Sequence, residues 1–269
     1  MAPAQYARPK EVTNIDECFF YHTMELPQVG LVNGLWDLRK DIQAYLGRQD
    51  FRSKSVLELG PASGYISFYM ESCGAEVVGY ELSEDQEWDV VPYAAKDMAR
   101  ELAVRKEHIR QLNNSFWYAH RLMGSKVKVL YGSVYEIPVD LGPFDTTVVG
   151  SILLHLRDPF LALQRVAART KATIIVTDTL SRFHLWPQLK FSSLLPKKLR
   201  RPQLHFIPDY SVAAPIDTWW RMNPSIIRAF LGVLGFEDTT THFHRQPFQG
   251  KSLPLFTVVG KRTKGSIRE

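Results

Sequence analysis

Residues 55–69 read Ser55-Val-Leu-Glu-Leu-Gly60-Pro-Ala-Ser-Gly64-Tyr-Ile-Ser-Phe-Tyr69. The apolar run at the start predicts a buried strand, the glycines predict a tight turn, and the residues from Tyr65 onward predict a helix. Such a turn brings backbone N–H groups and a helix N-terminus close to a polar ligand. The stretch therefore predicts an α/β protein with a ligand site directly after its first core strand.

An acidic residue follows at the distance expected of a ribose-binding carboxylate. The run Glu76-Val-Val-Gly-Tyr80 predicts the second strand, and Glu81 at its end is 21 positions after Gly60. A carboxylate at the tip of the second strand, about 20 residues after the turn, can accept hydrogen bonds from a ribose diol. The turn and the carboxylate together indicate a nucleoside-bearing cofactor, whereas a solvated strand-end carboxylate is the alternative for Glu81.

The spacing of the glycines argues against a dinucleotide. The G-x-G-x-x-G fingerprint uses its third glycine for close packing of helix on strand, but here Ala62 replaces the second glycine and Tyr65 the third. The run from Glu58 to Gly64 instead resembles the E/D-x-G-x-G-x-G motif of class I S-adenosylmethionine (SAM) methyltransferases. A methyl group at Ala62 is tolerable where no pyrophosphate approaches the backbone.

Composition sets the broad class of the protein. The 269 residues are 45% hydrophobic, which favours one elaborated domain with a sizeable core. A formal net charge of +5 is mildly basic and does not by itself indicate a nucleic-acid partner. Cys18 and Cys73 form no metal-ligand spacing, so no metal is expected. The sequence shows no signal-peptide pattern and no run of about 18 apolar residues, which predicts a soluble cytoplasmic protein without a transmembrane segment.

Strand and helix patterns alternate along the chain and predict a mostly parallel sheet with helices on both faces. After the first two strands, further strands are expected at 126–131, 146–150 and 172–178, and two final strands at 236–244 and 253–259. Helices are expected at 33–46, 65–73, 93–122, 159–168 and 224–234, with Asn113 and Asn114 as a point of interruption in the longest one.

The same patterns divide the chain into regions. We expect an N-terminal cap and helix over residues 1–50, a SAM-binding methyltransferase domain over 51–262 and a tail over 263–269. Residues 181–222 break the alternation with aromatic residues, prolines and the basic run Lys197-Lys-Leu-Arg-Arg201. An insertion of this length is typical of a lid or binding loop, here a substrate lid.

Across residues 17–262, the order of elements resembles the Rossmann-like class I SAM-dependent methyltransferases, whose sheet has seven strands. Within that superfamily the chain is similar to the branch that contains the tRNA wobble-uridine carboxymethyltransferases. The similar pieces are Tyr21-His22-Thr-Met-Glu-Leu26, Gly34-Leu-Trp36-Asp37-Leu-Arg39, Phe144-Asp145-Thr-Thr-Val-Val149 and Leu154-His155-Leu-Arg-Asp-Pro159. Those tRNA enzymes hold the carboxylate of carboxy-SAM with a tyrosine whose place is taken here by Leu154. Ordinary SAM is therefore the expected cofactor and S-adenosylhomocysteine (SAH) the expected product.

The resemblance implies a cofactor-binding set at the carboxyl ends of the strands, where such sheets bind ligands. Glu81 would take the ribose hydroxyls, Leu82 and Val134 would cover the adenine, and Ser133 stands where the family often has an acidic residue. The full set is Glu58, Gly60, Ala62, Gly64, Glu81, Leu82, Ser133, Val134, Gly150 and Ser151.

His155, directly after the fourth strand, is the candidate catalytic base. A neutral imidazole could deprotonate a hydroxyl or an amine as the methyl group moves, while capping or packing of the next helix is the alternative role. Substrate contacts are expected from Tyr21, His22, Trp36, His184, Trp186 and Trp219. Core packing is the alternative for these aromatic residues, above all for Trp36.

Three functions remain open from the sequence. The first is an O-methyltransferase, or less expectedly an N-methyltransferase, acting on a small molecule such as a sugar, a glycan or a secondary metabolite. The second is a tRNA wobble-uridine (carboxy)methyltransferase, because basic residues at 190–201 could bind phosphates between aromatic residues that stack on bases. The third is a non-catalytic scaffold with a SAM-binding fold. The oligomeric state is not indicated.

Overall fold

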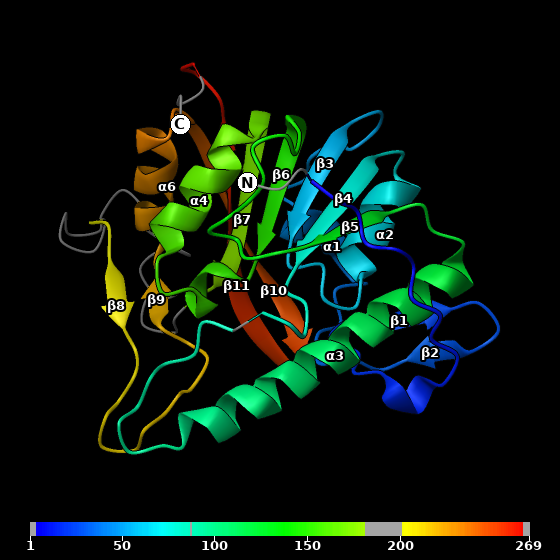
Figure 1. Ribbon diagram of the computed structural model, residues 1–269. Coiled ribbons are helices and arrows are strands. Elements are labelled where there is room, and N and C mark those ends of the chain that lie inside the picture. Colours follow the sequence, from blue (N-terminus) through cyan, green and yellow to red (C-terminus); the bar gives the residue numbers. More distant parts are fainter. Residues whose placement is uncertain (1–3, 87, 181–200, 266–269) are drawn as a thin grey trace.

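The computed structural model describes residues 4–86, 88–180 and 201–265, and its centre is a seven-stranded sheet (Figure 1). The strand order across the sheet is β10-β11-β7-β6-β3-β4-β5. Five strands are parallel, and β11 pairs antiparallel with both β7 and β10. In chain order the strands are β3 (Ser55–Leu59), β4 (Glu76–Glu81), β5 (Lys128–Tyr131), β6 (Phe144–Gly150), β7 (Thr170–Thr179), β10 (Asp238–Phe248) and β11 (Lys251–Lys261). The predicted α/β class and mostly parallel sheet are confirmed.

The strand order reverses beside β3. From β3 the chain moves outward to β4 and β5, and then returns to place β6 on the other side of β3. Loops that leave β3 and β6 in opposite directions open a crevice at the carboxyl ends of these strands, which is where open α/β sheets bind their ligands. The topology therefore fixes the place of the site before any side chain is considered.

Helices cover both faces of the sheet (Figure 1). Apolar residues of α2 and α3 pack with the N-terminal segment in one core cluster, and those of α4 and α6 form most of the helical part of another. The helices are α1 (Ile42–Tyr45), α2 (Tyr65–Ser72), α3 (Met98–Met123), α4 (Pro159–Ala168) and α6 (Pro224–Val233). Four of them, α1, α3, α4 and α6, start at side-chain caps; for example, Asp158 accepts from the Leu161 amide at 2.9 Å and Asn223 accepts from the Ile226 amide at 3.0 Å.

The prediction of a helix over 33–46 is wrong. Within 33–46, only α1 is helical. The N-terminal segment before it contains the short 3-10 helix η1 (Ile15–Glu17) and a small hairpin of β1 (Met24–Leu26) and β2 (Gly30–Val32). Backbone bridges join Trp36 to His22 and to Phe248, so the apolar residues of this stretch pack in an extended segment. Tertiary pairing has overridden the helical spacing of the sequence.

Asn113 and Asn114 do not interrupt α3. Their side-chain amides donate to the carbonyls of Leu82 at 2.9 Å and Glu17 at 3.0 Å, outside the helix. An asparagine that finds tertiary partners does not compete for the backbone of its own helix. The helix therefore continues from Met98 to Met123.

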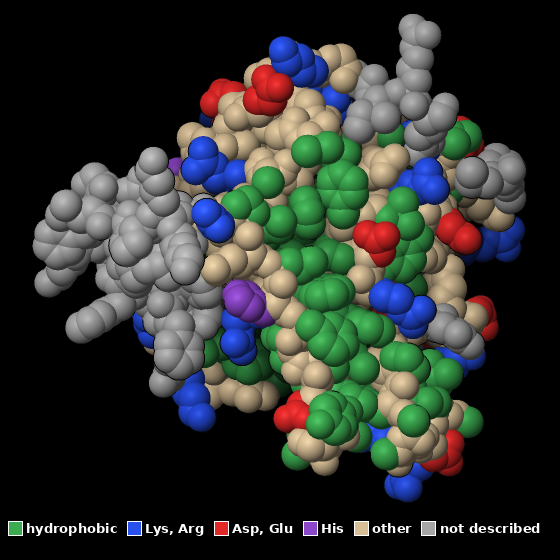
Figure 2. All heavy atoms as spheres, turned by 90° about the vertical axis from the view of Figure 1, so that its left-hand side faces the viewer, with side chains coloured by type: hydrophobic (Ala, Val, Ile, Leu, Met, Phe, Trp, Pro, Cys, Tyr) green, Lys and Arg blue, Asp and Glu red, His purple; other side chains and the backbone are tan. Residues whose placement is uncertain are grey.

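The described part of the insertion forms a second small sheet, in which β8 (Leu204–Phe206) pairs antiparallel with β9 (Trp220–Met222). These strands and α6 lie on the left of Figure 1, and hydrophobic side chains gather on the face of the molecule seen from that side (Figure 2). Exposed Phe206 and Tyr210 belong to this insertion. Among the described residues, no helix has the length and apolar character needed to cross a bilayer.

One glycine tests the unexpected N-terminal packing. A Cβ atom added to Gly34 would lie 2.4 Å from the backbone carbonyl carbon of His22, which has no flexible side chain to move aside. Overpacking of this kind costs about 1–3 kcal/mol, so Gly34→Ala should lower the free energy of unfolding by about that amount in urea denaturation.

Gly232 in α6 is the matched control, because an added Cβ there meets nothing within 4 Å. Replacing a helical glycine with alanine stabilises by about 0.5–1 kcal/mol, so Gly232→Ala should unfold at higher urea. Equal midpoints for the two variants would contradict the packing described for Gly34.

Candidate functional site

A cavity of ≈ 330 Å³ lies at the carboxyl ends of the central strands. Small-molecule sites are concave, mostly apolar and about 300–1,000 Å³ in volume. Its wall brings together many of the residues predicted from the sequence: Tyr21, Gly60, Ala62, Glu81, Leu82, Ser133, Val134, Gly150, Ser151 and His155. The crevice expected from the strand order is therefore a real cavity.

The carboxylate of Glu81 ties two parts of the wall together. It accepts a hydrogen bond from the Ala62 amide at 3.1 Å through one oxygen and from the Leu82 amide at 2.8 Å through the other. Burial raises the pKa of Glu81, while these two amide hydrogen bonds lower it. Each carboxylate oxygen has two acceptor sites, so both oxygens can also accept from a ligand diol.

The loop between β3 and α2 has the backbone shape that the glycines predicted. Gly60, Ala62 and Gly64 all have positive φ, at +68°, +52° and +90°. Alanine is an uncommon residue in this region of backbone space, and the amide of Ala62 is held there by Glu81. Gly64 also needs to lack a side chain, because an added Cβ would lie 2.5 Å from the ring of Phe68.

Apolar side chains flank Glu81 on the cavity wall. Leu82 follows it directly, Val134 comes from the loop after β5, and Leu112 comes from α3. These three residues could enclose a flat ring such as a nucleobase. Ser133 offers one hydroxyl, which already accepts from the Tyr135 amide at 3.3 Å.

The tip of β6 and the residue after it contribute Gly150 and Ser151 to the cavity wall. Gly150 cannot carry a side chain, because an added Cβ would lie 2.7 Å from the hydroxyl of Tyr45. Ser151 has φ +51°, and its hydroxyl is 3.3 Å from that of Tyr45. A small residue followed by a left-handed one lets a ligand approach the strand end closely.

His155 lies in the short 3-10 turn η2 (Leu153–His155), just after β6. Its Nδ1 is hydrogen-bonded to the main-chain carbonyl of Asp217. A carbonyl only accepts, so Nδ1 carries the proton, and the neutral ring keeps its lone pair on Nε2. Burial lowers the pKa of His155, which keeps the imidazole in the neutral form that a general base requires.

Sequence reasoning missed the outer part of the wall, which contains Trp88, Arg105, His108 and Asp217. Arg105, His108, Ile109 and Leu112 all line the cavity from α3, and their spacing of three and four residues is that of one helix face. The sequence could therefore have predicted that these residues share one face of α3. Asp217 lies in the loop between β8 and β9 and had no local signal.

The other predicted residues of the described ranges do not line the cavity and lie in the packed protein behind its wall. Glu58 is buried and accepts from the Ser67 hydroxyl, and Gly64 packs on Phe68. The other members of this set are His22, Trp36 and Trp219, all buried and none among the residues that line the cavity. The predicted substrate residues His184 and Trp186, with the basic residues at 190–200, lie outside the described residues.

The residues behind the wall have packing roles. Burial lowers the pKa of His22 to about 3, and its backbone N–H donates to the Ser63 hydroxyl at 2.9 Å. Trp36 packs on Phe248 with ring centroids 4.6 Å apart. Trp219 donates from its indole nitrogen to the carbonyl of Asp89 at 2.6 Å. Each of these residues supports the wall from outside.

Two buried acids accompany the site. Burial raises the pKa of Glu58 to about 8 and that of Asp178 to about 7. Asp178 accepts from the Thr179 amide at 2.6 Å through one oxygen, and its other oxygen has no partner among the described residues. Within the described ranges, no three His, Cys, Asp or Glu side chains are grouped so that they could hold a metal ion.

Solved structures share this architecture. The magnesium protoporphyrin IX methyltransferase of Synechocystis PCC 6803 with bound SAH is 14% identical, with a TM-score of 0.52 over 83% of this chain and 81% of that chain. The N-terminal domain of EvdMO1 with SAH bound is 17% identical, with a TM-score of 0.51 over 91% and 92%. The chain has the class I methyltransferase fold. Family models and curated proteins give no match to the sequence.

The raised pKa of Glu58 predicts how stability changes with pH. The unfolded chain releases this proton near the ordinary value of 4.5, whereas the folded protein keeps it up to about pH 8. The folded state therefore binds more protons between these values, and stability falls as pH rises. One pKa unit corresponds to about 1.4 kcal/mol, so the shift of Glu58 should cost wild type on the order of 3–4 kcal/mol between pH 5 and pH 8.

Glu58→Gln removes this titration and should flatten the dependence in urea denaturation at several pH values. Asp178 has the same sign of shift, so Glu58→Gln with Asp178→Asn should flatten it further. If Glu58→Gln alone kept the full wild-type dependence of stability on pH, the assignment of this dependence to Glu58 would be contradicted.

Proposed function

We propose that this protein is a SAM-dependent methyltransferase that methylates a hydroxyl group of a small molecule. One observation carries the proposal: an acid suited to a ribose diol and a neutral histidine lie on the wall of a single cavity at the strand ends. Glu81 stands at the tip of β4, and His155 follows β6. The fold supports it, because both of the solved structures described above hold SAH.

The residues present fit SAM. Glu81 would accept from the ribose hydroxyls while it keeps its amide hydrogen bonds. Leu82 and Val134 would cover the adenine, and Gly60, Gly150 and Ser151 would lie along the methionine portion. SAM supplies an already activated methyl group, so the protein mainly has to position the acceptor and exclude water.

His155 would take the proton of the acceptor. Its Nε2 has no hydrogen-bond partner among the described residues, and the Nδ1 contact with Asp217 keeps the basic lone pair on that nitrogen. General-base assistance of this kind contributes about 10²–10⁴-fold to the rate. A neutral imidazole matches a hydroxyl acceptor, which must lose its proton as the methyl group arrives.

The charges of the outer wall favour an uncharged acceptor. Arg105 is paired with Asp217 at 3.0 Å, and Asp89 is paired with Arg157 at 3.3 Å. Among the described residues of this wall, each of these two positive charges is thus balanced by a carboxylate, which does not favour an anionic substrate. Arg105 and Asp217 still hold spare donors and acceptors, which suits neighbouring hydroxyls such as those of a sugar.

The tRNA alternative has less support from the described residues. Its basic cluster at 190–201 is described only at Arg201, which is exposed. Leu154, which replaces the tyrosine that holds carboxy-SAM in the tRNA enzymes, does not line the cavity, and its carbonyl accepts from the Trp219 amide at 2.9 Å. We therefore propose ordinary SAM as the cofactor.

Calorimetric titration with SAM tests the cofactor. Wild type should bind SAM, and Glu81→Ala should weaken binding by at least about tenfold, because an acceptor of two ribose hydrogen bonds is lost. Glu76→Ala at the exposed start of the same strand is the matched control and should bind as wild type. Tighter binding of carboxy-SAM would favour the tRNA alternative, and binding of neither compound would favour the non-catalytic scaffold.

A panel of glycosides and phenols with radiolabelled SAM tests the acceptor and the base. For any accepted compound, His155→Gln should lower kcat by about 10²–10⁴-fold. Burial lowers the pKa of His155 below its ordinary value of 6.5, so the neutral base persists and the wild-type rate should stay level through pH 6.5. His120→Gln, in the distant half of α3, is the control; an equal loss in both variants would contradict a specific role for His155.

A further inference from the structure

His155 depends on a residue that belongs to no helix or strand. Its Nδ1–H donates to the main-chain carbonyl of Asp217, in the loop that joins β8 to β9. A main-chain carbonyl can fix the tautomer of a histidine only as firmly as the backbone around it is held. The anchoring of residue 217 therefore decides how well His155 is oriented.

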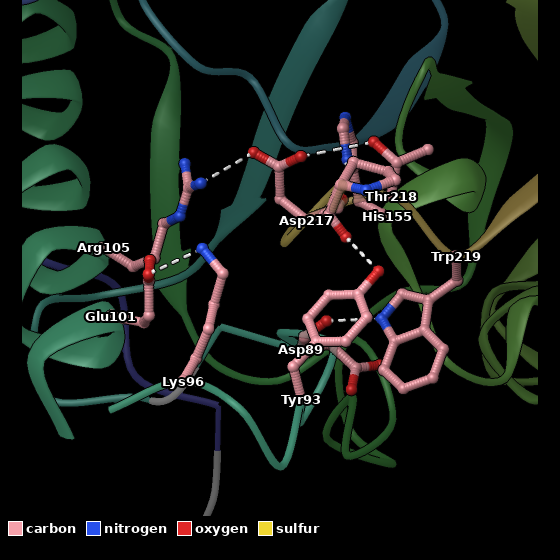
Figure 3. A network of polar contacts seen from close by, with 10 residues as sticks. Asp89, Tyr93, Lys96, Glu101, Arg105, His155, Asp217, Thr218 and Trp219 are labelled. Atoms are coloured by element: carbon pink, nitrogen blue, oxygen red, sulfur yellow. Dashed lines mark hydrogen bonds and ion pairs between the residues drawn. The ribbon is translucent and has the colours of Figure 1, made fainter. Parts of the chain in front are cut away.

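Neighbouring parts of that loop are attached to the segment that precedes α3 (Figure 3). The Val91 amide donates to the Ile216 carbonyl at 2.9 Å, and the Tyr93 hydroxyl donates to the Pro215 carbonyl at 3.2 Å. On the other side, the Trp219 indole donates to the Asp89 carbonyl. These contacts hold residues 215, 216 and 219, but none of them holds Asp217 itself.

Asp217 is held through its side chain. Its carboxylate pairs with the guanidinium of Arg105 at 3.0 Å and accepts from the Thr218 hydroxyl at 3.3 Å (Figure 3). Thr218 belongs to the same loop, so Arg105 provides the described link from Asp217 to a long helix. That helix, α3, packs its second half into the core, where Phe116 and Trp117 are buried.

Arg105 is itself well oriented. Its side chain is 20% exposed, and its guanidinium lies 5.6 Å from the ring centroid of Trp88. Trp88 in turn meets His155 edge to face, with ring centroids 6.3 Å apart. The four residues are thus joined in a ring of contacts: the Arg105 guanidinium contacts the Asp217 carboxylate and the Trp88 ring, and the Asp217 main-chain carbonyl and the Trp88 ring both contact the His155 imidazole.

We propose that Arg105 is a positioning residue that holds Asp217 in place, so that the Asp217 carbonyl keeps His155 in the tautomer with a free Nε2. The role of His155 as a base rests on the proposed function, but its orientation by Arg105 does not. Two charged groups act directly on His155: Asp217 raises its pKa and Arg105 lowers it. His108 on α3 and the pair Asp89–Arg157 also line or flank this end of the cavity.

Nitrogen NMR of the imidazole, recorded across pH without any substrate, tests the proposal. In wild type the shifts should report one dominant tautomer with the proton on Nδ1. Arg105→Met removes a nearby cation and leaves Asp217 unpaired, so it should raise the pKa of His155 by about 1 and mix the two tautomers. Arg105→Lys keeps the charge and should stay close to wild type.

Asp217→Asn keeps the main-chain carbonyl but breaks the ion pair. It should mix the tautomers, and adding Arg105→Met to it should mix them no further, because both changes remove the same link. Lys96→Met is the matched control. Lys96, just before α3, pairs with Glu101 of that helix at 3.1 Å (Figure 3), and this ion pair includes neither Arg105 nor Asp217. Unchanged tautomer and pKa of His155 in folded Arg105→Met or Asp217→Asn would overturn the proposal.

Calorimetry with SAM on the same variants separates the two proposals. The described contacts of Arg105 are with Asp217 and Trp88, whereas those of Glu81 are with Ala62 and Leu82. Arg105→Met should therefore bind SAM within about twofold of wild type if both proposals hold. Altered His155 tautomers in a protein that does not bind SAM would support the positioning role and contradict the proposed function. Unaltered tautomers in variants that still bind SAM would contradict the positioning role of Arg105 and support the proposed function.

Discussion

Glu81 joins the parts of the cavity that secondary structure leaves separate. Hydrogen bonds within the sheet align β3 with β4, but they do not shape the loop that leaves β3. The carboxylate does this by accepting from the Ala62 amide across the gap and from the Leu82 amide on its own strand. An ionised acceptor makes stronger hydrogen bonds than a neutral one, which helps hold an alanine at positive φ where most residues are disfavoured.

The two ends of the cavity are built on different physical principles. The end that contains Glu81 depends mainly on the sheet, because Gly60, Glu81 and Gly150 all lie at the carboxyl ends of parallel strands. The outer end is assembled from a helix face, a loop before α3 and a loop between β8 and β9, joined by an ion pair and scattered hydrogen bonds. The first arrangement follows from the strand order, whereas the second depends on contacts between segments that lie far apart in the sequence.

Local signals explain what the sequence predicted. The strand, turn and helix at 55–69 and the position of Glu81 follow from apolar runs and glycine spacing, and all of them are present. The face of α3 that carries Arg105 was also predictable, because its residues are spaced three and four positions apart, as on one side of a helix. The predicted helix over 33–46 is not formed because bridges from Trp36 to His22 and to Phe248 of β10 outweigh a weak periodicity. Asp217 could not be predicted because its place depends on contacts with residues far along the chain.

The position of β11 has a consequence for synthesis of the chain. This strand lies between β7 and β10 but follows both in sequence, so one edge of β7 stays open until Lys251–Lys261 have left the ribosome. β7 can pair with β6 on one side, but the other edge of this ten-residue strand, several of whose residues are fully buried in the finished protein, stays unpaired in the meantime. Exposed apolar edges are where nascent chains associate wrongly. The nascent chain thus passes through a stage in which its central strands are present but one edge of its sheet is unpaired and prone to aggregation.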